Sequence, residues 1–513
     1  MQRIMEQKDT HRGERIAKNT LMLYVRMFAL MLVGLYTSRV VLEALGENDF
    51  GIYNVVGGVV AMFTIISGAL NSAVARFITF EMGKGSDAQL EKVYSTAVTI
   101  QIILAIAVAV IAEPAGLWFI QNKMTIDPLR IPAAQWVLHF SIMAFVINLL
   151  SVPQMASITA HEKMSAYAYI GILDGLLRLA VAFIIAHSAS DRLILYSALM
   201  AGVVLVVRFA YGIYCRLHFP ECRFRPVFDR PLIKEMFSFA GWSFIGVTSG
   251  VLRDHGGNIL VNIFSGPAVN AARGVAVQLN GAVQGFVTNF MTAINPQITK
   301  SYASGDMKYM LSLVRKSSRM SFYLLFLIAL PILFNTEYLL SLWLKDVPAH
   351  TVVFVRLFLI FALCESLSNP LMTAAQATGD IRRYQTVVGG LILLNLPLSY
   401  IFLRAGFQPE VTVVVAIGLS VICLAARLVM LKSMIGLDVG GFLRRVCLNV
   451  VCVVAAALIL PSVLDGFIPD GFLGFCLSVI LCVTSAGLSV LMVGCSAKER
   501  KDIRDMLYKR FRR

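Results

Sequence analysis

Residues 92–112 read KVYSTAVTIQIILAIAVAVIA and carry a single charged side chain, at Lys92. About 20 consecutive apolar residues are enough for an α-helix to cross the ~30 Å hydrocarbon core of a bilayer. The run does not alternate between apolar and polar residues, as a strand of a membrane barrel would. This stretch therefore predicts a transmembrane helix. It decides the fold class, because similar stretches recur along the whole chain.

The composition of the chain agrees with this prediction. Of its 513 residues, 58% are hydrophobic and 15% are charged, whereas soluble globular chains have about 45–50% apolar and about 25% charged residues. A soluble core cannot hide this much apolar surface. We expect an all-α polytopic membrane protein with about fourteen transmembrane helices. The predicted spans are 18–42, 50–80, 92–112, 132–153, 165–187, 193–215, 235–264, 268–298, 320–342, 351–375, 385–403, 411–431, 446–464 and 472–495.

The positive charges indicate how the chain crosses the membrane. If the N-terminus is cytoplasmic, the cytoplasmic segments hold 31 Lys and Arg residues and the outer segments hold five. Lys and Arg collect in the cytoplasmic loops of membrane proteins, so both termini are expected in the cytoplasm. The net charge of +15 then reflects topology and attraction to anionic membrane lipids, and no nucleic-acid partner is expected. The basic tail 498–513 is predicted to form an amphipathic surface helix.

A shift of 220 residues aligns the chain with itself. It superposes Gly46 on Gly266 and Gly85 on Gly305, and it places the first two spans on the seventh and eighth. Six spans per repeat mean that both halves insert in the same direction, as parallel repeats do in transporters. We expect two six-helix lobes followed by two further helices. The expected parts are an N-tail (1–17), an N-lobe (18–216), a basic linker (217–234), a C-lobe (235–431), helices 13 and 14 (446–495) and a basic C-tail (496–513).

Ionisable residues inside spans are costly, and they usually face a cavity or a partner. The predicted spans hold nine arginines but only three clearly intramembrane acids, Asp174, Asp254 and Glu365. A central cavity lined in this way favours an anionic substrate. The candidates for binding its headgroup are Arg26, Arg178, Arg253 and Arg273. The arginines near span ends are expected to extend to the membrane interface; these are Arg39, Arg76, Arg208, Arg356 and Arg427.

Two of these candidates have a plain structural alternative. Asp174 and Arg178 are four residues apart with the acid first, which is the favourable order for an ion pair along one helix. The sequence therefore leaves open whether they bind substrate or only each other.

Polar residues also recur on one face of the eighth span. They follow at steps of 7, 4, 4 and 7 residues, which at 100° per residue makes a stripe about 33 Å long. Such a stripe either lines a cavity or bonds to neighbouring helices, and both readings stay open. The stripe consists of Arg273, Asn280, Gln284, Thr288 and Asn295, and the second span has a shorter equivalent that includes Asn71.

The seventh span contains the sequence Arg253-Asp254-His255-Gly256-Gly257. A cation, an acid and an imidazole that titrates in the physiological range favour a site for a coupling ion, and a local ion pair packed against the glycines is the alternative. The candidates for coupling to H⁺ or Na⁺ are Asp254, His255, Asp174 and Glu365. No other cofactor is expected. The nine cysteines include no CxxC pair, so no metal site is expected either.

The sequence gives no indication of an enzyme. It contains no Walker motif, no GxSxG and no HExxH, which are the patterns that position a phosphate, a nucleophilic serine or a catalytic zinc. The predicted outer segments are also too short to form a catalytic domain. A transporter is the expected class.

Several stretches together resemble polysaccharide and oligosaccharide-lipid flippases. These stretches are Asn19-Thr20, Arg39-Val40, Leu45-Gly46, Asp49-Phe50-Gly51-Ile52-Tyr53, Ala73-Val74-Ala75-Arg76, His161-Glu162-Lys163 and Ala293-Ile294-Asn295-Pro296-Gln297-Ile298. In this order they are similar, over the whole chain, to the multidrug/oligosaccharidyl-lipid/polysaccharide (MOP) exporter superfamily. The resemblance implies the two-lobed fold of the multidrug and toxin extrusion (MATE) transporters.

The resemblance also implies a function. It is that of a bacterial inner-membrane transporter that flips an undecaprenyl-pyrophosphate-linked oligosaccharide by alternating access, for polysaccharide or O-antigen export. A polysaccharide polymerase and glycosyltransferases are the implied protein partners. The alternative is an ion-coupled multidrug antiporter of the MATE type. Many such antiporters carry an acid inside the first span, and this chain has none there.

Overall fold

The computed structural model describes residues 2–61, 63–124, 126–225, 229–344, 346–469, 471–497 and 499–500. Within these ranges every regular element is helical. The amphipathic helix predicted for the C-tail lies almost wholly outside the described residues. The chain forms two compact units. We call the first, Met1–Val247 with Thr292–Gly305, the N-unit, and the second, Thr248–Met291 with Asp306–Arg513, the C-unit. The lobe boundaries expected from the sequence stay a prediction.

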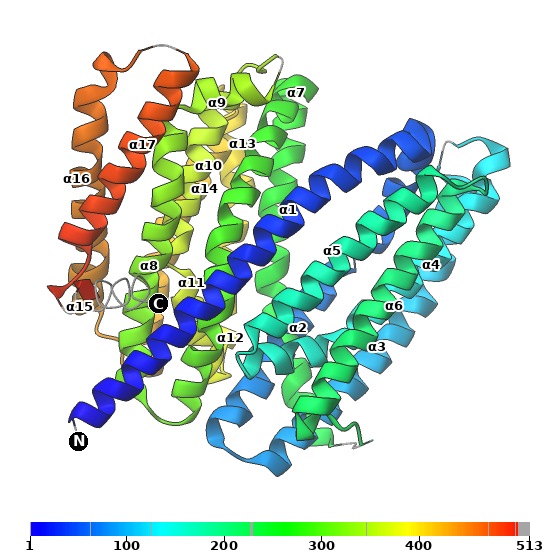
Figure 1. Cartoon of the computed structure of the whole chain (residues 1–513), viewed down its shortest axis with the longest axis horizontal. Coiled ribbons are helices and arrows are strands. Elements are labelled where there is room, and N and C mark those ends of the chain that lie inside the picture. Colours follow the sequence, from blue (N-terminus) through cyan, green and yellow to red (C-terminus); the bar gives the residue numbers. More distant parts are fainter. Residues whose placement is uncertain are drawn as a thin grey trace. The chain divides into compact units, whose positions relative to one another are not determined.

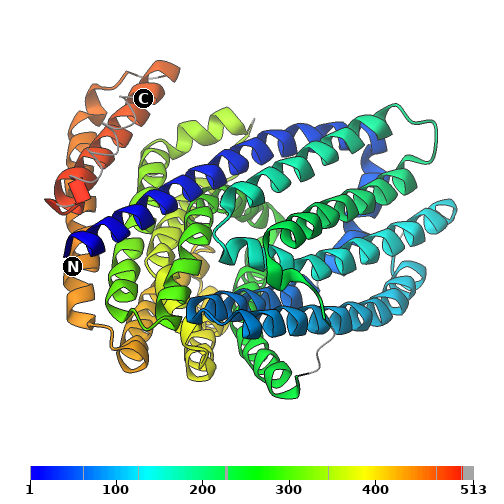
Figure 2. The same cartoon turned by 60° about the horizontal axis from the view of Figure 1, so that its bottom comes forward.

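The N-unit is built from long helices that pack side by side (Figures 1 and 2). The kinked helix α1 packs on α5, and α4 lies between α3 and α6. The helices are α1 (Gln2–Ala61), α2 (Thr64–Lys84), α3 (Asp87–Asn122), α4 (Ile131–Ala160), α5 (Met164–Ala186), α6 (Arg192–His218) and both ends of α7 (Arg230–Ala303).

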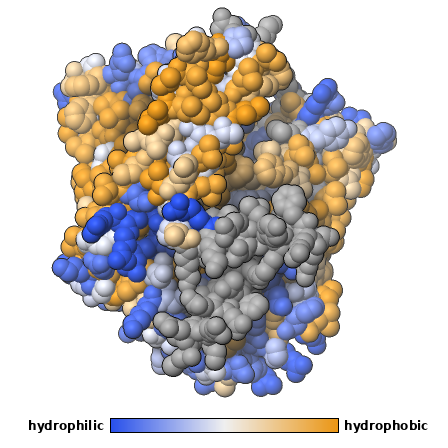
Figure 3. Space-filling view, turned by 60° about the vertical axis from the view of Figure 1, so that its left-hand side comes forward, coloured by the Kyte–Doolittle hydropathy of each residue, from blue (hydrophilic) through white to orange (hydrophobic). Residues whose placement is uncertain are grey.

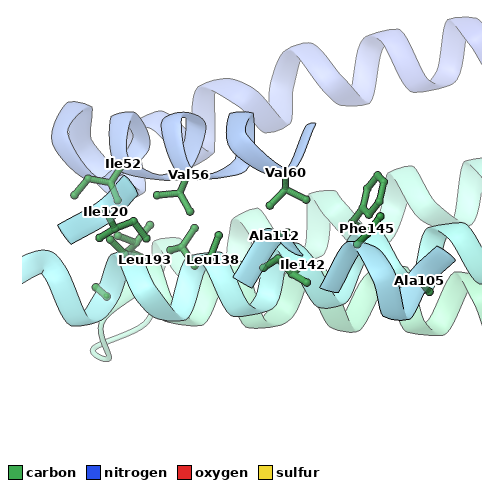
Figure 4. Close-up of a cluster of buried hydrophobic side chains, with 14 of the residues drawn as sticks. Ile52, Val56, Val60, Ala105, Ala112, Ile120, Leu138, Ile142, Phe145 and Leu193 are labelled. Atoms are coloured by element: carbon green, nitrogen blue, oxygen red, sulfur yellow. The ribbon is translucent and has the colours of Figure 1, made fainter. Parts of the chain in front are cut away.

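A hydrophobic cluster holds the second segment of α1 against its neighbours (Figure 4). Ile52 and Val56 project from α1 towards α3 and α4, where they meet residues such as Ile120 and Leu138. All four side chains are at most 6% exposed. Burying side chains of this size stabilises a fold by about 1.5–3 kcal/mol each, so the packing fixes the direction that the chain takes after its first kink.

The C-unit combines the middle of α7 with shorter helices. Its remaining elements are α8 (Met307–Phe334), α9 (Thr336–Trp343), α10 (Thr351–Ser366), α11 (Asn369–Thr378), α12 (Arg382–Leu393), α13 (Asn395–Arg404), α14 (Val411–Ile435), α15 (Val439–Phe442), the π-helix η3 (Leu443–Leu448), α16 (Asn449–Leu464) and α17 (Phe472–Ser489). Helix α17 packs on α16 and on α8. Much of the face in Figure 3 is apolar. In α16 and α17, Val451, Ile459 and Ile480 are each at least 60% exposed, as lipid-facing residues are.

Eleven helices among the described residues are long and apolar enough to cross a membrane. They correspond to eleven of the fourteen predicted spans, so the chain is a multi-pass membrane protein. The other three predicted spans, 50–80, 235–264 and 268–298, are helical but are not among the eleven. These are the spans richest in glycine and polar residues, including Arg253 and Asn280. The count of fourteen stays a prediction.

Two glycines break the long helices at equivalent places. Gly46 interrupts α1 with φ 75° and ψ 169°, and Gly266 interrupts α7 with φ 82° and ψ 175°. This region of backbone conformation is open essentially to glycine alone. The next pair, Gly85 and Gly305, also has positive φ values, 74° and 76°. The 220-residue shift seen in the sequence therefore relates two pairs of glycines that have closely similar, positive φ values.

To within one residue, the shift also relates two polar contacts. In the N-unit, Arg130 donates hydrogen bonds to Asp49 and, at 2.6 Å, to Asp191 at the start of α6. In the C-unit, His350 lies 220 residues after Arg130, and its Nδ1 atom is 2.6 Å from Oε1 of Glu410 at the start of α14. In the N-unit, a basic residue and an acid thus join the start of α4 to the start of α6. In the C-unit, the equivalent pair joins the start of α10 to the start of α14.

Substitution of the kink glycines tests this geometry. Gly46→Ala or Gly266→Ala forces a side chain into a glycine-only conformation, at a cost of about 1–3 kcal/mol. We expect both variants to melt at lower temperature than the wild type in detergent. Gly202→Ala in α6 is the control, because its Cβ would meet no atom within 4 Å and alanine favours a helix. Equal melting of Gly266→Ala and the wild type would contradict the assigned conformation.

Candidate functional site

The most deeply buried charge near the kink of α7 is Arg273, which is 4% exposed. Its Nη1 atom donates hydrogen bonds to the backbone oxygen of Asp254 (3.3 Å) and to Oδ1 of Asn258. A Cβ on Gly257 would lie 2.7 Å from the guanidinium, so this glycine leaves the space that the arginine fills. The Nε atom of Arg273 is buried and has no hydrogen-bond partner among the described residues. The site therefore holds one unused donor on a buried cation.

A second arginine lies on the other arm of the kink. The Nε atom of Arg253 donates to Oδ1 of Asp254 at 2.9 Å. The guanidinium of Arg253 lies 4.8 Å from the ring centroid of Phe361, and that of Arg273 lies 5.4 Å from the ring centroid of Phe358. Cations within about 6 Å of an aromatic face are attracted to it. Two rings one turn apart on α10 thus support both arginines.

The same face of α10 carries an acid one turn further on. Glu365 follows Phe358 and Phe361 at helical spacing, and its Oε1 atom lies 3.9 Å from Nη1 of Arg427 on α14. Arg427 is 1% exposed, and its Nε atom donates to the hydroxyl of Tyr384 at 3.1 Å. The expectation that Arg427 extends to the interface is wrong. It is instead the most buried member of a charged cluster inside the C-unit.

Arg76 does not extend to the interface either. It is 7% exposed, and its guanidinium lies 4.6 Å from the ring centroid of Phe77 and 4.3 Å from that of Phe80. The Phe239 ring of α7 lies on the same guanidinium at 5.8 Å. Two nearby rings on α2 and one distant ring on α7 thus bury the guanidinium of Arg76, which was expected to reach the membrane surface.

The N-unit has its own arginine site on α1. The guanidinium of Arg26 lies 4.5 Å from the ring centroid of Tyr167 on α5, and it packs against Gly171, where a side chain would overlap it. Its Nε atom is buried without a hydrogen-bond partner among the described residues. On α5, Arg178 donates to Asp174 at 3.0 and 3.1 Å. The sequence left open whether Asp174 and Arg178 bind substrate or each other, and in the structure they form an ion pair with each other.

The other predicted site residues are divided between the two units. Asn71 and His255 are exposed, whereas Asn280, Gln284 and Asn295 are half-buried. Asn280 and Gln284 belong to the C-unit and Asn295 belongs to the N-unit. Oδ1 of Asn280 is buried without a hydrogen-bond partner among the described residues. The role of these residues as a cavity lining, and that of the acids in ion coupling, stays a prediction.

One acid that was not predicted as a site residue joins three parts of the N-unit. Glu162, in the turn between α4 and α5, is 6% exposed and has a φ of 57°. Its carboxylate accepts from Gln297 and Lys300 at the end of α7, each at 3.1 Å. Its backbone oxygen accepts from Nδ2 of Asn19 on α1, also at 3.1 Å. The turn thus ties the start of the first span to the end of the eighth.

A neighbouring contact extends this tie to the linker. Nε2 of His161 lies 2.5 Å from Oε1 of Glu221, and the imidazole stacks on Phe219 with ring centroids 4.0 Å apart. Burial alone would raise the pKa of Glu221, but the hydrogen bond and the charge of His161 outweigh it, and the pKa lies below its ordinary value. The Glu221 carboxyl therefore stays ionised at neutral pH.

Known families match most of the chain. A family model described as a polysaccharide biosynthesis protein matches residues 16–302, and one described as MatE matches residues 257–401. No curated protein sequence matches the chain.

Solved transporter structures share the fold. A MATE transporter in the straight conformation has a TM-score of 0.72 at 11% identity and covers 82% of this chain and 97% of its own. An outward-facing multidrug resistance MATE transporter of the MOP superfamily has a TM-score of 0.71 at 10% identity, with 83% and 96% covered. A MOP superfamily transporter from Pyrococcus furiosus, described as having a binding pocket of reversed polarity, has a TM-score of 0.70 at 10% identity, with 82% and 96% covered. At these identities the likeness shows the fold alone.

Loss of the Glu162 carboxylate is expected to destabilise the protein. Glu162→Gln removes the charge that pairs with the largely buried Lys300, and leaving a buried polar group poorly satisfied costs about 1–3 kcal/mol. We expect a lower melting temperature for the purified variant. Glu91→Gln is the matched control, because Glu91 pairs with Arg225 at 3.1 Å but Arg225 is 72% exposed, and exposed pairs contribute about 0–1 kcal/mol. Equal shifts in both variants would show that Glu162 is not a structural tie.

Proposed function

Because the chain belongs to the polysaccharide biosynthesis protein family, we propose that it flips a lipid-linked oligosaccharide across a bacterial inner membrane. It is a membrane transporter of the MOP superfamily, and the families and folds that it matches are those of transporters rather than enzymes. The proposed substrate carries its glycan on undecaprenyl pyrophosphate, for export of polysaccharide or O-antigen. Transport proceeds by alternating access.

The unused donor on Arg273 is the observation that carries this proposal. A pyrophosphate cannot cross hydrocarbon bare, because an unpaired ion in a low dielectric pays a very large desolvation cost. The protein has to replace its water with donors and positive charge. Arginine does this well, since its guanidinium stays protonated and its planar fork pairs with phosphate oxygens. Arg273 and Arg26 each present a buried guanidinium with an Nε atom that has no hydrogen-bond partner among the described residues.

Arg253 has a different role in this scheme. Its fork already pairs with Asp254, so an incoming phosphate has to compete with a carboxylate. Arg178 is in the same position, because Asp174 occupies its Nε atom. We infer that Arg26 and Arg273 make the tighter contacts and that Arg253 and Arg178 contribute mainly positive potential.

A multidrug antiporter of the MATE type is the second candidate, and the MatE family match favours it. A cation exporter needs acids that face its cavity. Of the three intramembrane acids, Asp174, Asp254 and Glu365, Asp254 is the most exposed, with 58% of its side chain accessible. It already pairs with Arg253. The excess of intramembrane arginines over acids therefore supports an anionic substrate.

The remaining parts of the proposal rest on the family and on charge. We place both termini in the cytoplasm from the distribution of Lys and Arg. Membrane lipids surround the protein, and a polysaccharide polymerase and glycosyltransferases are its proposed partners. Coupling to H⁺ or Na⁺ is proposed through Asp254, His255, Asp174 or Glu365.

Substitution of Arg273 tests the anion site. Arg273→Ala removes the charge-assisted hydrogen bonds to phosphate, which contribute about 1.5–3 kcal/mol each, so glycan export should fall at least about tenfold. Lysine should restore export in part, because it keeps the charge and loses the fork. Export is measured at the cell surface and normalised to protein level. Arg404→Ala, on an exposed arginine of α13, is the control. Wild-type export by both Arg273→Ala and Arg26→Ala would refute the site.

Thiol labelling tests the polar stripe. If Asn280 and Gln284 line an aqueous cavity, cysteines at these positions in a cysteine-free background should react with membrane-impermeant thiol reagents. A cysteine at Ala282, about 160–200° around the helix from both, should not react. Equal labelling on both faces would show that the stripe is not a cavity lining.

A further inference from the structure

An apolar groove runs between α7 and α13 in the C-unit. It has a volume of about 550 Å³ and is lined by Gly256, Ile259 and Leu260 of α7 and by Leu396, Pro397 and Ile401 of α13. The hydroxyl of Tyr400 is the one polar side-chain group among the residues that line it. Ile259 and Ile401 are 60% and 59% exposed, so the groove opens to the surroundings of the helix bundle.

Residues in both helices explain the shape of the groove. Gly256 lacks a side chain, and a Cβ there would lie 2.6 Å from Leu396, so α13 approaches α7 closely at this level. Pro397 cannot donate a backbone hydrogen bond, and the span divides into α12 and α13 just before it. Nδ2 of Asn395 donates to the backbone oxygen of Thr412 at 3.2 Å, which fixes the bend. The shape of the groove thus follows from the glycine of α7 and the bend before α13.

The groove and the arginine site share one turn of α7. Gly256 faces Leu396, and the next residue, Gly257, faces the guanidinium of Arg273. At 100° per residue, Gly256 and Leu260 lie within about 60° of Arg253 around the helix. The apolar groove therefore adjoins the buried Arg273 and the half-buried Arg253, and the two glycines between them carry no side chain.

We propose that this groove binds the polyprenyl tail of the lipid whose pyrophosphate is held at Arg273. The inference rests on the proposed function and adds a site for the other end of the same molecule. The tail of this substrate begins directly at the pyrophosphate, so a tail site has to start next to the phosphate site. The groove meets this condition, because Gly256 lines it and the next residue, Gly257, faces the guanidinium of Arg273.

Depth distinguishes this occupant from a bulk phospholipid. Arg253 lies thirteen residues before the kink at Gly266, which is about 20 Å along the helix. Gly266 falls between the predicted spans 235–264 and 268–298, and the backbone oxygen of Asp254 accepts from Arg273. With the kink at the membrane surface, both arginines would lie inside a hydrocarbon core of about 30 Å. A phospholipid keeps its headgroup at the membrane surface. A lipid that enters the groove at the level of the arginines is one whose headgroup the protein already holds.

Photo-crosslinking tests the groove. We place p-benzoylphenylalanine at position Ile401 of the full-length protein and, as the matched control, at Val421 of α14, which is 54% exposed. Each protein is reconstituted in vesicles of phosphatidylethanolamine and phosphatidylglycerol that contain undecaprenyl pyrophosphate. Mass spectrometry gives the ratio of polyprenyl to phospholipid adducts. We expect this ratio to be at least several-fold higher at Ile401, and Leu260→Trp, which fills the groove, to lower it.

The failures of the two proposals are distinguishable. Equal ratios at Ile401 and Val421, or a crosslink to a second copy of the chain at Ile401, would overturn the tail site. If the tail site were overturned but Arg273→Ala still abolished export, the proposed function would stand without the tail site. Export that is unaffected in the arginine variants would overturn the proposed function itself.

Discussion

The structure depends on one constraint, which is that a guanidinium inside the membrane has to find its partners within the protein. Three arginines of the C-unit satisfy this constraint in different ways. Arg253 pairs with the adjacent Asp254, and Arg427 bonds to Tyr384. Arg273 donates to the backbone oxygen of Asp254 and to the amide oxygen of Asn258, and its Nε atom has no hydrogen-bond partner in the described part of the chain. The low dielectric that strengthens the bonds that are made also makes an unmade one costly. The unused donor is therefore where an anionic ligand gains most.

Glycine makes these arrangements possible. Gly266 turns α7 back on itself so that Arg253 and Arg273, twenty residues apart, meet the same face of α10. Gly257 leaves the volume that the guanidinium of Arg273 fills. In the N-unit, Gly171 does the same for Arg26. Backbone positions without a side chain thus recur next to buried cations, because a long flexible side chain can enter a helix interface only where its neighbour is small.

The sequence predicted what is local and missed what is distant. Apolar length identified eleven spans, and the i, i+4 spacing of Asp174 and Arg178 identified their ion pair. The partners of Arg427 and Glu162 were not predictable, since Tyr384 is 43 residues from Arg427 and Lys300 is 138 residues from Glu162. Nearness to a span end also misled the interpretation of Arg427, because an arginine there can reach either the interface or partners inside the protein, and one sequence does not distinguish them.

The pairing of the arginines also bears on release of the substrate, which a transporter needs as much as capture. A site with only unpaired cations would hold a pyrophosphate too tightly to let it go. Here Asp254 competes for the fork of Arg253 at 2.9 Å, so part of the positive charge near the site is already satisfied by the protein. Arg273 still has an Nε atom without a hydrogen-bond partner among the described residues. The net attraction for an anion would then be set by a small difference between two sets of hydrogen bonds, and we expect it to depend on the spacing of the two arms of α7 that meet at Gly266.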